Sequence, residues 1–152
     1  MKHWTPKTPY LATDGIIEVY DQSGRFEGIV LIERKNIPKG LAFPGGFVEI
    51  GESVENALRR EMKEETALEV SIVKLLGVYS DPQRDKRFHT VSVVFICRAT
   101  GIPRGCDDAK EAFVYALDKV PKDKLVFDHQ KIFEEYMKQR VDAQKHNTLP
   151  IV

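Results

Sequence analysis

One helical segment limits most strongly what this chain can fold into. Residues 53–66 contain no Pro or Gly and are dominated by strong helix formers, and Ser53 stands where an N-cap is expected. At roughly 100° per residue, Glu61, Glu64 and Glu65 fall within one arc of about 100° on the helix surface. The sequence therefore predicts a helix of about three to four turns with its carboxylates gathered on one side.

This acidic arc does not coincide with the polar face of the helix. It overlaps the apolar positions, which are Val54, Ala57, Leu58 and Leu68. Glu61 and Glu65 form a like-charged i,i+4 pair, which costs about 0.2–0.5 kcal/mol when exposed and more when partly buried. An ordinary solvated helix would pair such charges with Lys or Arg on its polar face. We expect a cation here instead, because clustered carboxylates without His or Cys neighbours select Mg²⁺ or Mn²⁺ over zinc.

The rest of the chain alternates between apolar runs and broken segments. Two runs rich in β-formers, at 10–20 and 28–34, surround a Ser-Gly turn and predict a hairpin. Residues 35–46 hold two Pro and three Gly and predict a loop. The later segments are apolar runs at 71–80, 88–99 and 113–117 and an amphipathic stretch at 128–141, which predicts a second helix.

These elements favour the α/β class, with helices packed on the faces of a mixed β-sheet. We expect one domain over residues 1–152, with a core at about 8–138 and an extended or frayed tail at 142–152.

Composition excludes several classes of protein. The 23 Lys and Arg residues balance 23 Asp and Glu residues, so the chain offers no basic field for nucleic acid or an anionic membrane surface. No segment approaches the ~20 apolar residues of a membrane span, and the first ten residues lack a signal-peptide core, so we expect a cytoplasmic protein. Cys97 and Cys106 predict neither a zinc site nor a disulfide framework.

The acidic helix and the glycines before it match a known pattern. Its fixed positions, with five residues between the glycine and the first glutamate and seven before the arginine, are Gly46, Glu52, Arg60, Glu61, Glu64 and Glu65. This spacing resembles the Nudix box, which carries Gly where this chain has Ala67. The resemblance implies a Nudix-type α/β/α sandwich that hydrolyses a nucleoside diphosphate linked to a second group, using divalent metal held by the box.

The resemblance also implies roles for the box residues. Glu61 and Glu65 are the expected principal metal ligands, and Glu64 is either a further ligand or the base that activates water. Glu52 and Arg60 are expected to form an ion pair that ties the preceding loop to the helix.

Residues outside the acidic helix are candidates for completing the site. The paired glycines Gly45 and Gly46 permit close approach, so we predict the Gly45 carbonyl as a metal ligand and Gly46 as a substrate contact. Arg34, at the end of the second β-rich run, is a candidate for binding phosphate. Arg84 and Arg87, in a charged loop, are candidates for the same role, although a solvated charge run is an equal interpretation.

Several other stretches resemble the ADP-ribose pyrophosphatase-like branch of the family. They read TPYLATDGII, KGLAFPGGFVE, YSDPQRDKRFHTVSVVF and FDH. The resemblance implies Mg²⁺-dependent cleavage of ADP-ribose to AMP and ribose 5-phosphate, with Mn²⁺ as a substitute. Related enzymes can take a catalytic carboxylate from a loop outside the box, for which we prefer Glu111 over Asp107 and Asp108. Relatives are often homodimers, and the apolar chain ends are compatible with that assembly.

Two alternatives stay open at this point. One is a nucleotide-pool hydrolase acting on a modified nucleoside triphosphate or a dinucleoside polyphosphate. The other is a Nudix-fold sensor that binds ADP-ribose without cleaving it. The complete set of box glutamates argues against the sensor.

Overall fold

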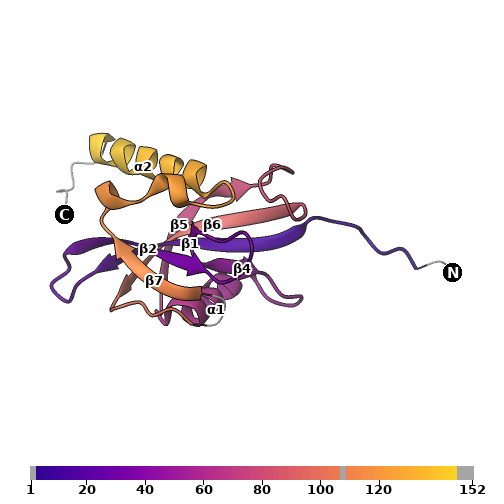
Figure 1. The fold of residues 1–152 in the computed structure, drawn as a ribbon, viewed down its shortest axis with the longest axis horizontal. Helices are drawn as coiled ribbons and strands as arrows, with labels where there is room; N and C mark the ends of the chain where they lie inside the picture. Colours follow the sequence, from indigo (N-terminus) through magenta and orange to yellow (C-terminus); the bar gives the residue numbers. More distant parts are fainter. Residues whose placement is uncertain (1–2, 107–108, 147–152) are drawn as a thin grey trace.

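One mixed sheet runs through the molecule and carries a helix on each face (Figure 1). The computed structural model describes residues 3–106 and 109–146. The strands are β1 (Tyr10–Tyr20), β2 (Phe26–Arg34), β3 (Leu41–Ala42), β4 (Gly45–Phe47), β5 (Ser71–Tyr79), β6 (Thr90–Thr100) and β7 (Ala109–Tyr115). The helices are α1 (Val54–Thr66) and α2 (His129–His146), with short 3₁₀ turns η1 (Leu117–Lys119) and η2 (Lys122–Lys124) between β7 and α2.

The sheet is mixed, as the sequence predicts. Its main path runs β3-β2-β1-β6-β5, while β4 pairs with β1 and β7 pairs with β2. Strands β1 and β6 are parallel, and the other pairs are antiparallel. The predicted hairpin is confirmed as β1 and β2.

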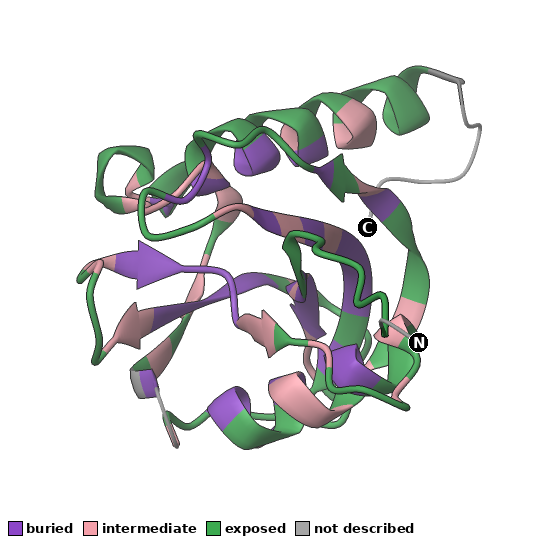
Figure 2. Cartoon of the chain, turned by 90° about the vertical axis from the view of Figure 1, so that its right-hand side faces the viewer, coloured by how far each residue is buried: buried purple, intermediate pink, exposed green. Residues whose placement is uncertain are grey.

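Two large clusters of buried hydrophobic residues lie on the two faces of the sheet, and Figure 2 shows buried segments in the strands and in both helices. Successive strand residues point to opposite faces, so Ile16 and Ile17 belong to different cores. Ile16 shares one core with Ile132 of α2, and Ile17 shares the other with Leu58 and Met62 of α1. The α/β/α arrangement is therefore confirmed.

Helix α1 begins and ends through specific caps. The Asn56 N–H donates to the Ser53 hydroxyl at 3.1 Å, which confirms the predicted N-cap. At the other end Ala67 adopts a left-handed conformation with φ of 63°, and its N–H donates to the Lys63 carbonyl. A non-glycine residue in this conformation costs about 1–2 kcal/mol. Ala67 thus makes the turn that glycine makes more easily.

Three segments differ most from the sequence predictions. The predicted loop at 35–46 contains β3 and most of β4, because its backbone pairs with β2 and β1 despite its Gly and Pro content. Strand β7 starts at Ala109 rather than at 113. Helix α2 continues to His146, so residues 142–146 are helical rather than extended, and 147–152 lie outside the described residues.

None of the helices in the described part of the chain has the length and apolarity needed to cross a membrane.

Candidate active site

Helix α1, β4 and the segments before β6 and α2 border a cavity of about 330 Å³. It brings together seven of the predicted residues: Arg34, Gly45, Gly46, Glu61, Glu65, Arg84 and Arg87. Among the described residues predicted for the site, four do not line it: Glu52, Arg60, Glu64 and Glu111. The cavity therefore has an acidic side, with Glu61 and Glu65, and a basic side, with Arg34, Arg84 and Arg87.

The three glutamates of the acidic arc differ in burial. Glu65 is buried, with 5% of the residue exposed. The side chain of Glu61 is 13% exposed, and that of Glu64 is 43% exposed. Glu61 and Glu65 both line the cavity, whereas Glu64 does not.

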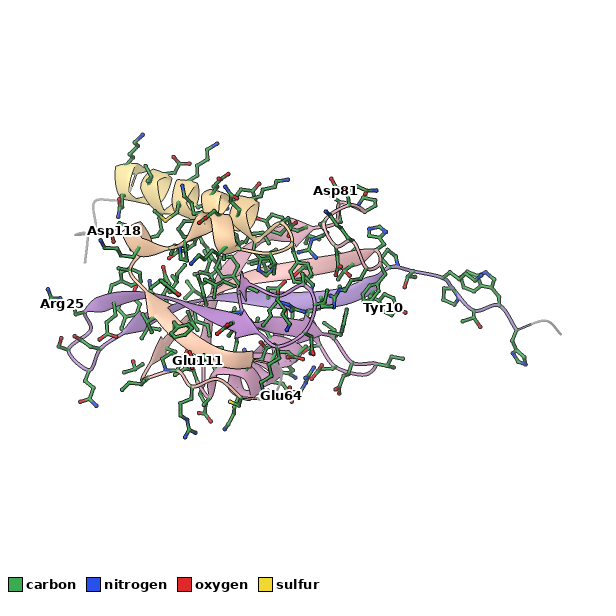
Figure 3. All side chains as sticks on the ribbon, viewed as in Figure 1. Tyr10, Arg25, Glu64, Asp81, Glu111 and Asp118 are labelled. Atoms are coloured by element: carbon green, nitrogen blue, oxygen red, sulfur yellow. The ribbon has the colours of Figure 1, made fainter. Side chains whose placement is uncertain are left out.

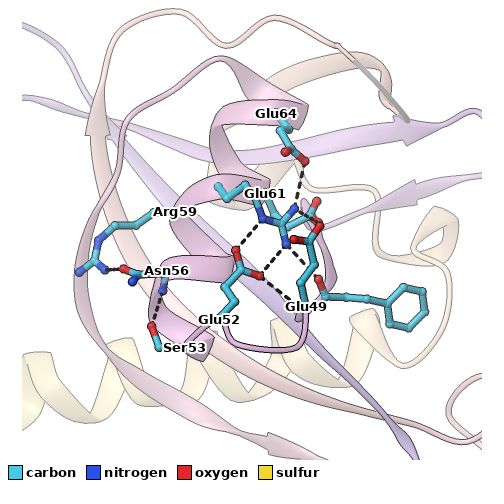
Figure 4. A network of polar contacts seen from close by, with 9 residues as sticks. Glu49, Glu52, Ser53, Asn56, Arg59, Glu61 and Glu64 are labelled. Carbon is cyan, nitrogen blue, oxygen red and sulfur yellow. Dashed lines mark hydrogen bonds and ion pairs between the residues drawn. The ribbon is translucent and has the colours of Figure 1, made fainter.

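Arg60 of α1 is the centre of a polar network. Figure 4 shows this network, with Glu52, Glu61 and Glu64 labelled. Its Nε and one terminal nitrogen donate to both carboxylate oxygens of Glu52, at 2.7 and 2.9 Å. Its other terminal nitrogen donates to Glu61 at 2.9 Å and to Glu64 at 3.2 Å. The Phe47 carbonyl accepts a further bond at 3.1 Å. Arg60 therefore pairs with Glu52, as expected from the resemblance, and also separates the charges of Glu61 and Glu64.

The same network fixes the charge of Glu52. The hydrogen bond from Arg60, followed by the N–H of Glu49, lowers the pKa of Glu52 to about 2. Glu52 is consequently ionised at any physiological pH. Its ion pair with Arg60 therefore does not depend on pH in that range.

The glycines before α1 are required for space. A Cβ at Gly46 would lie 2.4 Å from Oε1 of Glu61. A Cβ at Gly45 would lie 2.1 Å from Oδ1 of Asp14 and 2.3 Å from the Thr13 carbonyl oxygen. The close approach that the sequence predicts at these glycines therefore involves the protein's own carboxylates.

The basic wall is built around one phenylalanine. The guanidinium carbons of Arg34 and Arg87 lie 5.0 and 5.3 Å from the centre of the Phe127 ring. Phe127 has a positive φ of 57°, and Arg34 also donates to the Pro38 carbonyl at 2.8 Å. Burial first, and the charge of Arg87 second, lower the pKa of Arg34. The cavity thus holds close cationic groups that an anion would stabilise.

Two of the predicted arginines are also tied by acids. Arg84, with a side chain 4% exposed, donates to both oxygens of Asp128 at 2.9 and 2.7 Å. Arg87 donates to both oxygens of Asp85 at 3.1 and 2.9 Å. The charged loop before β6 is therefore not a simple solvated run. Its arginines line the cavity from ion-paired positions.

Sequence reasoning missed Asp14 and His129 as cavity residues. Ser92 donates to Asp14, and the imidazole Nε2 of His129 lies 3.9 Å from Asp14 Oδ2. The Phe43 N–H donates to Nδ1 of His129 at 3.0 Å, which places the ring proton on Nε2. Burial lowers the pKa of His129 to about 4. Asp14 is one of two acids, with Glu18, in the apolar run at 10–20, and an acid in such a run was the available signal.

Glu111 stands apart from these residues. It lies on β7 opposite Glu33 of β2, its residue is exposed, and Figure 3 shows it on a different element from Glu64. Asp107 and Asp108, the other acids considered for this role, lie outside the described residues. A catalytic role for Glu111 stays a prediction.

The candidate metal ligands at the cavity are oxygen donors. Asp14, Glu61 and Glu65 all line it, together with the backbone of Gly45. Within residues 3–106 and 109–146, no three His, Cys, Asp or Glu side chains are gathered closely enough to form a preformed metal site. The donor types fit a hard cation, and one that completes its shell with waters and ligand phosphates fits better than one held by protein alone.

The fold, the glycine turn and the glutamate helix together define the Nudix class, and the chain belongs to that family. The NUDIX domain model matches residues 9–136. The chain is a Nudix hydrolase, and it is similar over most of its length to an ADP-ribose pyrophosphatase.

Particular relatives agree with this placement. The chain is 51% identical over 133 residues to the ADP-ribose pyrophosphatase of Methanocaldococcus jannaschii, covering 86% of this chain and 74% of that protein. A MutT/nudix family protein from Enterococcus faecalis superposes with a TM-score of 0.80 at 28% identity, over 96% of this chain and 67% of that one. A bifunctional NMN adenylyltransferase/ADP ribose pyrophosphatase from Francisella tularensis, complexed with AMP and a Mn ion, superposes with a TM-score of 0.75 at 25% identity. The match covers 88% of this chain and 42% of that one.

Proposed function

We propose that this protein hydrolyses the diphosphate of ADP-ribose to AMP and ribose 5-phosphate with the help of a divalent metal ion. The observation that carries the proposal is that acidic and basic side chains line the same cavity. Glu61 and Glu65 supply the negative charges, and Arg34 and Arg87 supply the positive charges. A diphosphate bridges such walls, because its oxygens bind arginine directly and carboxylates through a cation. The name of the M. jannaschii relative supports ADP-ribose as the substrate.

Glu61, Glu65 and the Gly45 carbonyl are the groups that would hold Mg²⁺ or Mn²⁺. Mg²⁺ is normally bound by one or two carboxylates plus substrate phosphates, which suits a site that is not closed by protein groups alone. The Francisella neighbour with bound Mn supports Mn²⁺ as a substitute. A bound divalent ion supplies Lewis acidity and lowers the pKa of a coordinated water.

The chain's own residues position the reactants. Arg34 and Arg87 bind phosphate oxygens, since both are held at the cavity by Phe127. Arg60 and Glu52 fix the orientation of the Glu61 carboxylate through the hydrogen bonds described above. Glu64 is either an additional ligand or the group that accepts a proton from the attacking water. Its exposure and its long contact with Arg60 leave both roles open to it.

A product assay over a panel of nucleotides tests the substrate. Purified protein with Mg²⁺ is given ADP-ribose, NADH, diadenosine polyphosphate and 8-oxo-dGTP, and products are separated by chromatography. We expect ADP-ribose to be turned over preferentially, with AMP as a product. Preference for another member of the panel would show that the protein is a different Nudix hydrolase. Tight binding of ADP-ribose without turnover would identify a sensor.

Glutamate variants test the metal site separately from the substrate. Glu64→Gln and Glu65→Gln should lower kcat by orders of magnitude, and Glu65→Gln should also weaken Mn²⁺ binding measured by electron paramagnetic resonance. Glu55→Gln is the matched control, since Glu55 is an exposed residue in the first turn of the same helix. Near-normal rates in both variants would contradict the metal site. The expectation of a homodimer stays a prediction, and sedimentation equilibrium checks it.

A further inference from the structure

Three exposed aromatic rings lie next to one another, and one of them, Phe47, lines the cavity. Tyr10, Phe47 and Phe88 have ring centres 4.8–6.0 Å apart, and 60%, 42% and 39% of these residues are exposed. We call these three residues the aromatic cluster. Contiguous exposed apolar surface of this kind is typical of binding sites.

The aromatic cluster continues the cavity rather than standing apart from it. Alternation along β1 places Tyr10 on the same side of the strand as Asp14, which lines the cavity. Phe47 lines the cavity itself. The guanidinium carbon of Arg87, another lining residue, lies 5.0 Å from the centre of the Phe88 ring. The rings therefore form an apolar rim beside the charged walls.

Backbone bonds hold this rim in place. The Tyr10 N–H donates to the His89 carbonyl at 3.0 Å, which ties the start of β1 to the residue after Phe88. Phe47 is opposite Ala12 in the β4–β1 ladder. Figure 3 shows Tyr10 at the end of β1, where the chain joins the sheet. A ligand that contacts these rings meets a largely preformed surface, which limits the entropic cost of binding.

The other phenylalanine lining the cavity does not offer a comparable surface. Phe127 is already in contact with the guanidinium groups of Arg34 and Arg87. Its neighbourhood is cationic and suits a phosphate. Of the two phenylalanines that line the cavity, Phe47 is thus the one beside which a flat uncharged ring fits.

We propose that the aromatic cluster binds the heterocyclic base of the nucleotide by stacking, while the charged cavity binds its phosphates. The inference rests on the proposed function in taking the ligand to be a nucleoside diphosphate. Because every base has a π-face, this rim supplies affinity for a base-bearing ligand and little discrimination between bases.

A fluorescent mononucleotide tests the base site without catalysis. Binding of 1,N6-etheno-AMP is followed by its fluorescence, and inorganic pyrophosphate is measured in parallel as a ligand without a base. Tyr10→Ala and Phe88→Ala should each weaken etheno-AMP binding about tenfold and leave pyrophosphate binding unchanged. Tyr10→Phe and Phe88→Tyr should retain binding. Phe113→Ala is the matched control, because Phe113 is 37% exposed on β7 and does not line the cavity.

Kinetics and assembly complete the test. With ADP-ribose, the two alanine variants should raise KM about tenfold and leave kcat unchanged, since stacking is remote from the bond that breaks. Weaker etheno-AMP binding in a protein that does not hydrolyse ADP-ribose would support the base site and contradict only the proposed function. Unchanged etheno-AMP binding, or an equal loss for pyrophosphate, would overturn the inference. A change from dimer to monomer with unchanged etheno-AMP binding would also overturn it, and would identify the cluster as a subunit interface.

Discussion

Replacing Gly46 by alanine moves one carboxylate and little else. The added Cβ would lie 2.4 Å from Oε1, 2.5 Å from Cδ and 2.6 Å from Oε2 of Glu61, whereas ordinary contact begins at 3.4 Å. The carboxylate must therefore retreat by about 1 Å. A misplacement of this size costs on the order of 100-fold in rate when it moves a group that positions reactants. We expect kcat to fall about 100-fold, equivalent to about 2.7 kcal/mol of activation free energy.

The stability of Gly46→Ala should change little, because the obstructed atoms belong to the end of a flexible side chain. The neighbouring Gly45→Ala provides the contrast. Its Cβ would lie 2.3 Å from the Thr13 carbonyl oxygen and 2.8 Å from the Cα of Asp14, both in the backbone of β1. The strand itself must shift, so Gly45→Ala should lose about 1–3 kcal/mol of unfolding free energy.

Release of AMP from ADP-ribose measures the first effect, and urea unfolding followed by circular dichroism measures the second. Gly77→Ala is the control, since its added Cβ would meet only the Tyr79 ring at an ordinary 3.4 Å. A near-normal kcat in Gly46→Ala would refute the placement of Glu61 in the reaction. A loss of activity that merely follows a loss of folded protein would refute the separation of the two glycines.

Three further predictions concern stability. Asp128→Ala leaves the buried Arg84 without its bidentate partner and should lower the free energy of unfolding in urea by about 3–5 kcal/mol; a loss below 1 kcal/mol would contradict this pairing. His129 has a folded pKa of about 4 against 6.5 for the free group, so the unfolded chain binds more protons between these values. Stability should therefore fall as pH drops from 6.5 to 4, by up to about 1.4 kcal/mol per pH unit, and His129→Asn should flatten that slope. Ala67→Gly should raise the unfolding free energy by about 0.5–1 kcal/mol by relieving the left-handed conformation; a lower melting temperature would count against that reasoning.

The acidic helix was predictable because several local signals agree. The absence of Gly and Pro, the Ser53 cap and the box spacing all point to the same helix, and the structure places it at Val54–Thr66. The angular count also places Ala57 and Leu58 on the buried side correctly, whereas Thr66, which it places on the polar side, is buried as well. Helix geometry alone does not predict the hydrogen bond from Arg60 to Glu61. The direction of the Arg60 side chain also depends on the loop that precedes the helix.

Contacts between distant segments were beyond the sequence. Arg84 and Asp128 are 44 residues apart and meet only because the loop before β6 lies beside the start of α2. The short strand β4 forms because β1 offers its backbone to Gly45 and Gly46, against their weak strand propensity. In both cases the tertiary arrangement decides, and no local pattern in the sequence records it.

Three residues that break local rules line the cavity. Asp14 is an acid within an apolar strand, and Gly46 is a glycine within a ladder. Phe127 holds a positive φ that a bulky side chain rarely adopts, at a cost of order 1–3 kcal/mol. Each of these departures places a group at the cavity wall, and the Phe127 ring is held there by Arg34 and Arg87. Functional sites are where local rules are expected to be broken, so these three residues in one cavity agree with a site maintained for binding.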